Sequence, residues 1–136
     1  MSSARQKILE DLKGLLEQIP EFPKVYYWKD LDFQFEENAI EFRDPIEDTK
    51  SVNVPYQKCL YVVVSAVKFT DNLLEDGSQI LAILEGAIVK LSVTPGNVSL
   101  KSNEKVVQTK GKTAIRVVVK IEVVYREELE DSPTSP

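Results

Sequence analysis

The 136 residues are enough for one domain with one core, and a content of 43% hydrophobic and 29% charged residues is ordinary for a folded protein. The formal net charge of −5 argues against a general nucleic-acid binder, which needs a basic surface to displace counterions from phosphate. The sequence has no histidine, the commonest general base and metal ligand, and its single cysteine, Cys59, excludes an internal disulfide and a cysteine-cluster zinc site.

Neither a membrane span nor a secretion signal is predicted. No stretch reaches the roughly 18 consecutive apolar residues of a membrane span. The first residues, MSSARQKILEDLK, lack an apolar core followed by a small-residue cleavage site. We therefore expect a protein kept in a reducing cytoplasm, in which Cys59 is a buried strand residue rather than a reactive thiol.

A one-sided helix is predicted over residues 3–19. Ser2 or Ser3 is a suitable N-cap, and Pro20 ends the helix because proline cannot continue it. The apolar residues share one stripe at helical spacing: Ile8, Leu9, Leu12, Leu15, Leu16 and Ile19.

Two short strands and a long loop are predicted next. Residues 24–28, KVYYW, and 39–42, AIEF, are typical of strands, and residues 30–38 either extend the first strand or bridge to the second. Residues 43–57 show no periodicity and contain two prolines. Loops longer than roughly 12 residues are uncommon in compact domains and are often functional. This segment is either a plain surface loop or a loop that contacts a partner.

Residues 58–69, KCLYVVVSAVKF, are predicted to form a central strand. Both of its alternating faces are mostly apolar, which is typical of a strand covered on both sides. One side can be covered by helices. The other side then needs a second layer of the same chain or a neighbouring subunit.

A second helix is predicted within residues 71–91. Gly77 is unfavourable in a helix interior, so the regular helix is expected to begin only near Ser78. Residues 94–97, TPGN, are typical of a turn.

The sequence then predicts a polar edge strand over residues 98–108 and a tight turn at residues 110–111. A two-residue turn pairs Val98 with Val123, Leu100 with Ile121 and Val106 with Ile115. The same register sets two like-charged pairs opposite each other, which is unfavourable: Lys105 with Arg116, and Lys101 with Lys120.

The long final strand is predicted over residues 113–125, TAIRVVVKIEVVY. Six alternate positions carry no polar group except the last hydroxyl: Ile115, Val117, Val119, Ile121, Val123 and Tyr125. Thirteen residues at ~3.3 Å each reach roughly 43 Å. A globule of this length is only ~36 Å across, so the strand either bends or projects beyond its domain.

These elements predict an α+β fold with the order α-β-β-β-α-β-β. The simplest architecture is a mainly antiparallel sheet with both helices packed on one face. Residues 1–125 form one domain, and residues 126–136, REELEDSPTSP, are an acidic tail that is expected to be disordered or to dock to a partner.

No catalytic, cofactor or metal motif is present in the sequence. There is no Walker loop, GxGxxG, GxSxG, HExxH or EF-hand pattern, and the acid pairs are adjacent in sequence, which is typical of solvated surfaces. The aromatic group at residues 26–28, with Phe33 and Phe35, could stack on bases or sugars, but core or subunit packing is favoured. We therefore predict neither an enzyme nor a cofactor.

The order and proportions of the elements resemble the phage tail terminator, or tail-completion, family. The segments that carry the resemblance are RQKILEDLKGLLEQI, KVYYW, KCLYVVVSAVKF, ILAILEGAIVKL and IRVVVKIEVVY, spread over residues 3–125. The resemblance implies a small α+β structural protein of the virion tail or neck, assembled in the host cytoplasm. It also implies a hexameric ring that caps the tail tube and docks to the head connector or stopper, while DNA passes through without specific binding.

A ring of this kind needs a heterologous interface between copies. We expect the loop at 43–57 and the hairpin at 98–113 to carry it, together with the charges of the final strand. The candidate interface residues are Arg43, Asp44, Lys50, Lys105, Lys110, Arg116, Lys120 and Glu122. Two alternatives stay open. One is another phage neck or tube component; the other is a cytosolic enzyme or small-ligand-binding domain with a deep polar pocket.

Overall fold

The structure is a computed structural model that describes residues 3–29, 38–49, 56–109 and 111–127. Within these residues two helices and five strands follow the predicted order α-β-β-β-α-β-β. Their bounds are α1 (Ala4–Glu17), β1 (Lys24–Tyr27), β2 (Ala39–Thr49), β3 (Tyr56–Phe69), α2 (Leu73–Ile88), β4 (Gly96–Gln108) and β5 (Ala114–Glu127).

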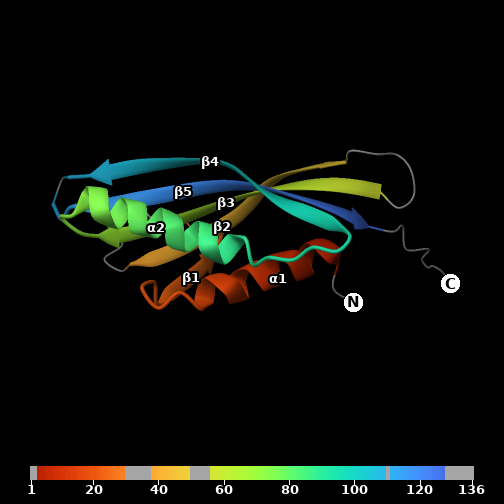
Figure 1. The fold of residues 1–136 in the computed structure, drawn as a ribbon, viewed down its shortest axis with the longest axis horizontal. Coiled ribbons are helices and arrows are strands. Elements are labelled where there is room, and N and C mark those ends of the chain that lie inside the picture. Colours follow the sequence, from red (N-terminus) through yellow and green to blue (C-terminus); the bar gives the residue numbers. More distant parts are fainter. Residues whose placement is uncertain (1–2, 30–37, 50–55, 110, 128–136) are drawn as a thin grey trace.

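The strands form one sheet in the order β1-β2-β3-β5-β4 (Figure 1). β1 and β2 are parallel, whereas the other neighbouring strands are antiparallel, so the predicted mainly antiparallel sheet is confirmed. β5 pairs with β3 along its whole length, from Ala114 opposite Phe69 to Glu127 opposite Tyr56. The long final strand therefore does not extend beyond the sheet, because its neighbour is equally long.

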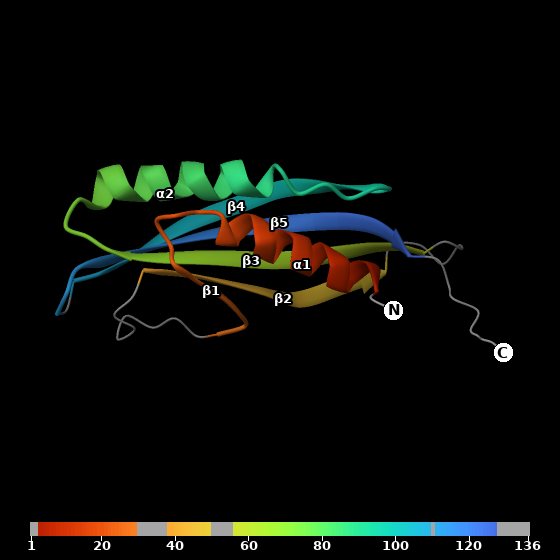
Figure 2. The same cartoon turned by 90° about the horizontal axis from the view of Figure 1, so that it is seen from below.

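Both helices pack on the same face of the sheet (Figure 2). Their buried stripes contribute Ile8, Leu12 and Leu16 from α1, and Ile80, Leu84 and Ile88 from α2. The sheet contributes alternate residues of its two central strands: Leu60, Val62 and Val64 from β3, and Val117, Val119, Ile121 and Val123 from β5. The predicted α+β architecture is thus confirmed, and we call this side of the sheet the covered face.

Helix α1 begins and ends close to the predicted positions. Ser3 is the N-cap, and its Oγ accepts a hydrogen bond from the backbone N of Gln6 at 3.0 Å. The helix ends at Glu17, shortly before Pro20. Capping and the proline therefore set the two ends of this helix, as the sequence predicts.

Helix α2 runs through Gly77, so the predicted start near Ser78 is wrong. Gly77 is buried, and a Cβ at this position would lie 2.7 Å from Cδ1 of Ile115 in β5. The glycine lets the helix approach the sheet closely, and this packing outweighs its helical penalty of about 1 kcal/mol. The first turn is further fixed by Asp76, which accepts hydrogen bonds from the Thr70 hydroxyl and the Lys68 ammonium.

Strand β2 continues to Thr49, so the predicted loop at 43–57 is wrong over residues 43–49 and 56–57; residues 50–55 lie outside the described residues. The alternating pattern of a strand is absent from the sequence here, because the register of β2 against β3 shifts between Arg43 and Ile46. Asp44 and Pro45 together face Val62 there, which is a β-bulge. A bulge is one of the few places where a sheet accommodates proline, and it breaks the alternation that sequence analysis reads.

Strand β4 forms the edge of the sheet, as predicted, and begins two residues earlier than expected, at Gly96. Gly96 has a φ of +151°, and a Cβ there would lie 2.0 Å from the backbone O of Val124. Only glycine fits where the chain enters this strand. The predicted pairs of Val98 with Val123 and Leu100 with Ile121 are confirmed.

A second bulge, between Leu100 and Ser102, changes the register of the rest of β4. The predicted pair of Val106 with Ile115 is therefore wrong, since Val106 lies opposite Arg116. The shift also removes both unfavourable cationic pairs. Lys105 lies opposite Val117, and Lys101, which sits at the bulge, places its Nζ 3.9 Å from Oε2 of Glu122.

Candidate assembly interface

The sheet face opposite the helices is the first candidate surface, and we call it the open face. No helix or strand of the described residues covers it. Its side chains come from alternate positions of the strands: Arg43 of β2, Tyr61, Val63, Ser65 and Val67 of β3, and Arg116, Val118, Lys120, Glu122 and Val124 of β5. Aliphatic and charged residues therefore alternate across it.

One end of the open face is closed by aromatic side chains. Ala39, Val67 and Ala114 lie side by side on three strands and are at most 1% exposed. Tyr26 and Phe69 pack against them. Burial on the open face also extends beyond this cluster, since Ser65 and Val118 are each 8% exposed and Cys59, toward the other end, is 0% exposed.

The β2 part of the open face carries an ion pair between Glu41 and Arg43, and the guanidinium of this pair contacts Trp28 at the edge of the sheet. Glu41 is only 2% exposed, and its Oε2 accepts a hydrogen bond from Nε of Arg43 at 2.7 Å. The guanidinium also lies over the ring of Trp28, with its Cζ 5.6 Å from the ring centroid. The pair compensates a buried carboxylate that would otherwise be costly.

The structure places four of the predicted interface residues on the open face and two others on the opposite side of the sheet. Arg43, Arg116, Lys120 and Glu122 all lie on the open face. Lys105 lies on the covered side of the sheet, with its Cδ 3.6 Å from the position of a Gly77 Cβ. Asp44 lies on the helix side of β2. Lys50 and Lys110 lie outside the described residues.

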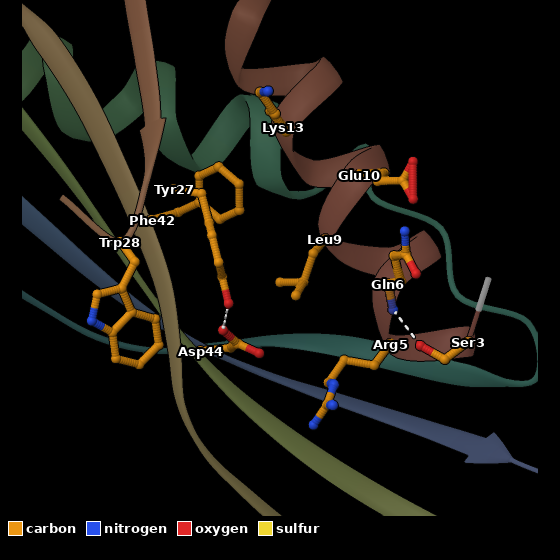
Figure 3. Close-up of a pocket in the computed structure, with 10 residues that line it drawn as sticks. All are labelled: Ser3, Arg5, Gln6, Leu9, Glu10, Lys13, Tyr27, Trp28, Phe42 and Asp44. Atoms are coloured by element: carbon orange, nitrogen blue, oxygen red, sulfur yellow. Dashed lines mark hydrogen bonds between the residues drawn. The ribbon is translucent and has the colours of Figure 1, made fainter.

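A groove between α1 and the β1–β2 edge was not predicted from the sequence (Figure 3). Its volume is about 560 Å³. It is lined by Ser3, Arg5, Gln6, Leu9, Glu10 and Lys13 of the α1 region, and by Tyr27, Trp28, Phe42 and Asp44 of the sheet. The aromatic run at residues 26–28, for which the sequence predicts core or subunit packing, was a signal for it. Tyr27 and Trp28 are 50% and 49% exposed, so they are not core residues of the chain.

The central polar contact of the groove joins Tyr27 and Asp44. The Tyr27 hydroxyl donates a hydrogen bond to the Asp44 carboxylate, as Figure 3 shows. This bond, with partial burial and the carboxylate charge, raises the pKa of Tyr27 to about 12. The hydrogen bond holds the Tyr27 ring against Phe42, whose ring centroid is 5.2 Å away.

The other polar groups at this end of the molecule also bond to one another. Glu47 accepts a hydrogen bond from the Tyr125 hydroxyl, and its Oε1 lies 3.3 Å from the Arg5 guanidinium and 3.9 Å from Lys58 Nζ. These contacts tie α1, β2, β3 and β5 together. In the described part of the chain, no group of three or more His, Cys, Asp or Glu residues could hold a metal ion.

Trp28 has an unusual backbone conformation at the end of β1. Its φ of +57° lies in the left-handed region, which a bulky residue rarely adopts. The backbone N of Trp28 donates a 2.9 Å hydrogen bond to the carbonyl O of Phe42, which holds the turn. The result is an indole that stands at the edge of the sheet.

Comparisons with known proteins add little to this geometry. No protein-family model and no curated protein matches the chain. Among solved structures, the type 4 fimbrial biogenesis protein PilO from Pseudomonas aeruginosa is similar over 88% of this chain and 68% of its own, with 15% identity and a TM-score of 0.38. A likeness of this size supports no argument about fold or function. No helix among the described residues has the length and apolar character to cross a membrane.

Proposed function

We propose that this chain is a structural protein of a phage virion, a tail terminator that forms a ring, caps the tail tube and joins it to the head connector. The order of elements supports the resemblance on which the proposal rests. The single observation that carries it is the open face of the sheet. The proposal is for a protein without catalytic activity.

The open face supports assembly because the central strand is apolar on both sides. On the covered face, Val62 and Val64 are at most 1% exposed under the helices. On the open face, Tyr61 and Val63 are only partly buried, and no element of the described residues lies over them. A neighbouring copy or the end of the tail tube would complete their burial, at about 25 cal/mol per Å² of apolar surface.

The charges of the open face are compatible with a specific protein–protein contact that does not bind DNA. Glu122 is paired with Lys101, and Glu41 with Arg43, so cations and anions alternate rather than forming one basic patch. Phosphate binding needs a basic surface, and the whole chain carries a net charge of −5. DNA can therefore pass such a ring without being held.

Tube growth in the presence of the purified protein tests the proposal. The protein would be added to tail-tube subunits of the same phage during polymerisation, and tube length would be measured by electron microscopy. We expect short tubes with a ring at one end. A matched control is Val63→Asp, which changes the centre of the open face and should leave the tubes to grow freely.

Three other results would point elsewhere. Tubes that elongate normally with no protein at their ends would refute the terminator role. Self-polymerisation of the protein into long tubes would favour a tube subunit instead. A small-ligand-binding domain is the second candidate, since the groove lies within the ~300–1,000 Å³ of known ligand sites. It is less well supported, because Tyr27 and Asp44 bond to each other rather than converging on a ligand.

A further inference from the structure

The exposed large hydrophobic residues gather at the two opposite edges of the sheet. Of the eight such residues in the described part of the chain, six lie on edge elements. We call Tyr27, Trp28 and Ile46 the β1 edge patch, and Leu100, Val106 and Val107 the β4 edge patch. Each patch spans both faces of its edge: Tyr27, Leu100 and Val107 lie on the covered side, and Ile46 and Val106 lie on the open side. Each of the six is between 40% and 55% exposed. The other two are Leu74 and Val89 of the α2 region.

The two patches cannot cover each other within one molecule. They lie on opposite sides of a five-stranded sheet, as Figure 1 shows. Three or four strand spacings of about 4.8 Å separate them by roughly 14–19 Å. A contact between the two patches therefore requires two copies of the chain.

Both edges are also incompletely paired in their backbones. Among the described residues, β4 pairs with β5 on one side and no strand pairs with its other side, which makes β4 an edge of the sheet. β1 pairs with β2 only as far as Phe42, so no strand of the described residues pairs with the outer side of β2 beyond it. The bulge at Asp44 and Pro45 interrupts this second edge, which favours side-chain packing there over a continuous ladder.

The charges of β4 and of the free part of β2 are complementary, whereas Lys24 and Lys29 are cations that flank the aromatic part of the β1 edge patch. β4 carries Lys101 and Lys105 against one acid, Glu104, and is net positive. The free part of β2 carries three acids, Asp44, Glu47 and Asp48, against Arg43, and is net negative. A β4 edge therefore meets opposite charge at a β2 edge, whereas it meets its own charge at a second β4 edge.

We propose that the β4 edge patch of one copy packs against the β1 edge patch of the next copy. This inference rests on the proposed function and identifies the contact between neighbouring copies in the proposed ring. A contact between two different surfaces is heterologous, and repeated contacts of this kind close into a ring when the rotation allows it. Contact between two β4 edges would instead be isologous and would stop at a dimer.

Cysteine cross-linking tests the proposal because the native Cys59 is 0% exposed and is the sole cysteine. Variants Trp28→Cys and Val106→Cys would be treated with a short bismaleimide, alone and mixed, and separated on a denaturing gel. We expect each variant alone to stay uncross-linked and the mixture to give covalent dimers. A chain with both substitutions should give a ladder that ends at the size of the ring.

Two further variants keep the test decisive. Ile46→Cys replaces Trp28→Cys if the loss of the indole prevents folding, since Ile46 lies at the same edge and is 55% exposed. Leu74→Cys is the control, because Leu74 is 84% exposed and belongs to α2 rather than to either edge patch. It should not cross-link with Val106→Cys.

The outcomes separate this inference from the proposed function. Cross-linking of Val106→Cys to itself, or rings without any cross-link between the edges, would overturn the inference while leaving the terminator role standing. Rings that cross-link as expected but fail to stop tube growth would support the inference and refute the terminator role. A chain that stays monomeric at every concentration and with tubes present would overturn both.

Discussion

The two faces of the central strands differ in the types of residue that they carry. On the covered face, the alternate positions from Leu60 to Ala66 of β3 and from Ile115 to Val123 of β5 are aliphatic. Beyond them, the Tyr125 hydroxyl donates a hydrogen bond to Glu47. On the open face, Val63 and Val118 stand between Arg43, Arg116 and Lys120. The covered face thus determines whether the chain folds, while the open face is left to determine what it contacts.

Adjacent substitutions on β3 give the largest expected contrast. Val64→Asp would place a carboxylate at a position that is 0% exposed, at a cost of about 3–5 kcal/mol, a large part of the ~5–15 kcal/mol that stabilises a domain. Val63→Asp would lie between Arg43 and Lys120 on the neighbouring strands and could pair with both. Circular dichroism should show an unfolded Val64→Asp and a folded Val63→Asp.

The Val63→Asp and Val64→Asp variants also test whether the open face takes part in assembly. Folded Val63→Asp protein should have lost the ability to cap tubes if the open face is a contact surface. Equal stability of the two variants in urea would show that Val63 and Val64 tolerate a buried carboxylate equally and that the two faces do not differ. Normal capping by Val63→Asp would remove the open face from the interface.

Helix α2 shows the same difference between a side that packs and a side that does not. Gly86 is exposed, and a Cβ there would have no atom within 4 Å, whereas a Cβ on Gly77 would lie 2.7 Å from Ile115. Gly86→Ala should therefore gain up to about 1 kcal/mol of stability from helical propensity, or roughly 4 °C in Tm. Gly77→Ala should gain nothing or lose stability, because Ile115 must move. A larger gain for Gly77→Ala in thermal unfolding would contradict the close packing.

The sequence predicted the elements better than their registers. The helical stripe of α1 and the alternation in β3 and β5 are local patterns, so they identified those elements and the covered face. The bulges at Pro45 and at Lys101 depend on the partner strand, which no local pattern contains. Gly77 was misread for a related reason, since its role depends on Ile115, far away in the chain. The Tyr27–Asp44 contact joins two strands, and the groove around it could not be predicted from either strand alone.

Titration of Tyr27 gives the smallest expected effect and tests the rim of the covered face. Its hydrogen bond to Asp44 raises its pKa to about 12 from 10.0. The folded state therefore holds this proton more tightly than the unfolded state does. The stabilisation is fully present below pH 10 and is lost as the pH rises through about 12. It should be small, because half of the side chain is exposed.

The measurement is a difference titration of phenolate absorbance between the native protein and Tyr27→Phe. One phenolate should appear with a midpoint near 12, and Asp44→Asn should bring that midpoint down, because the carboxylate that accepts the hydrogen bond is gone. A midpoint near 10 in the native protein would mean that Tyr27 does not hold Asp44 in solution. The rim of the groove would then be less ordered than the covered face beneath it, and the β1 edge patch would be less preorganised for a neighbouring copy.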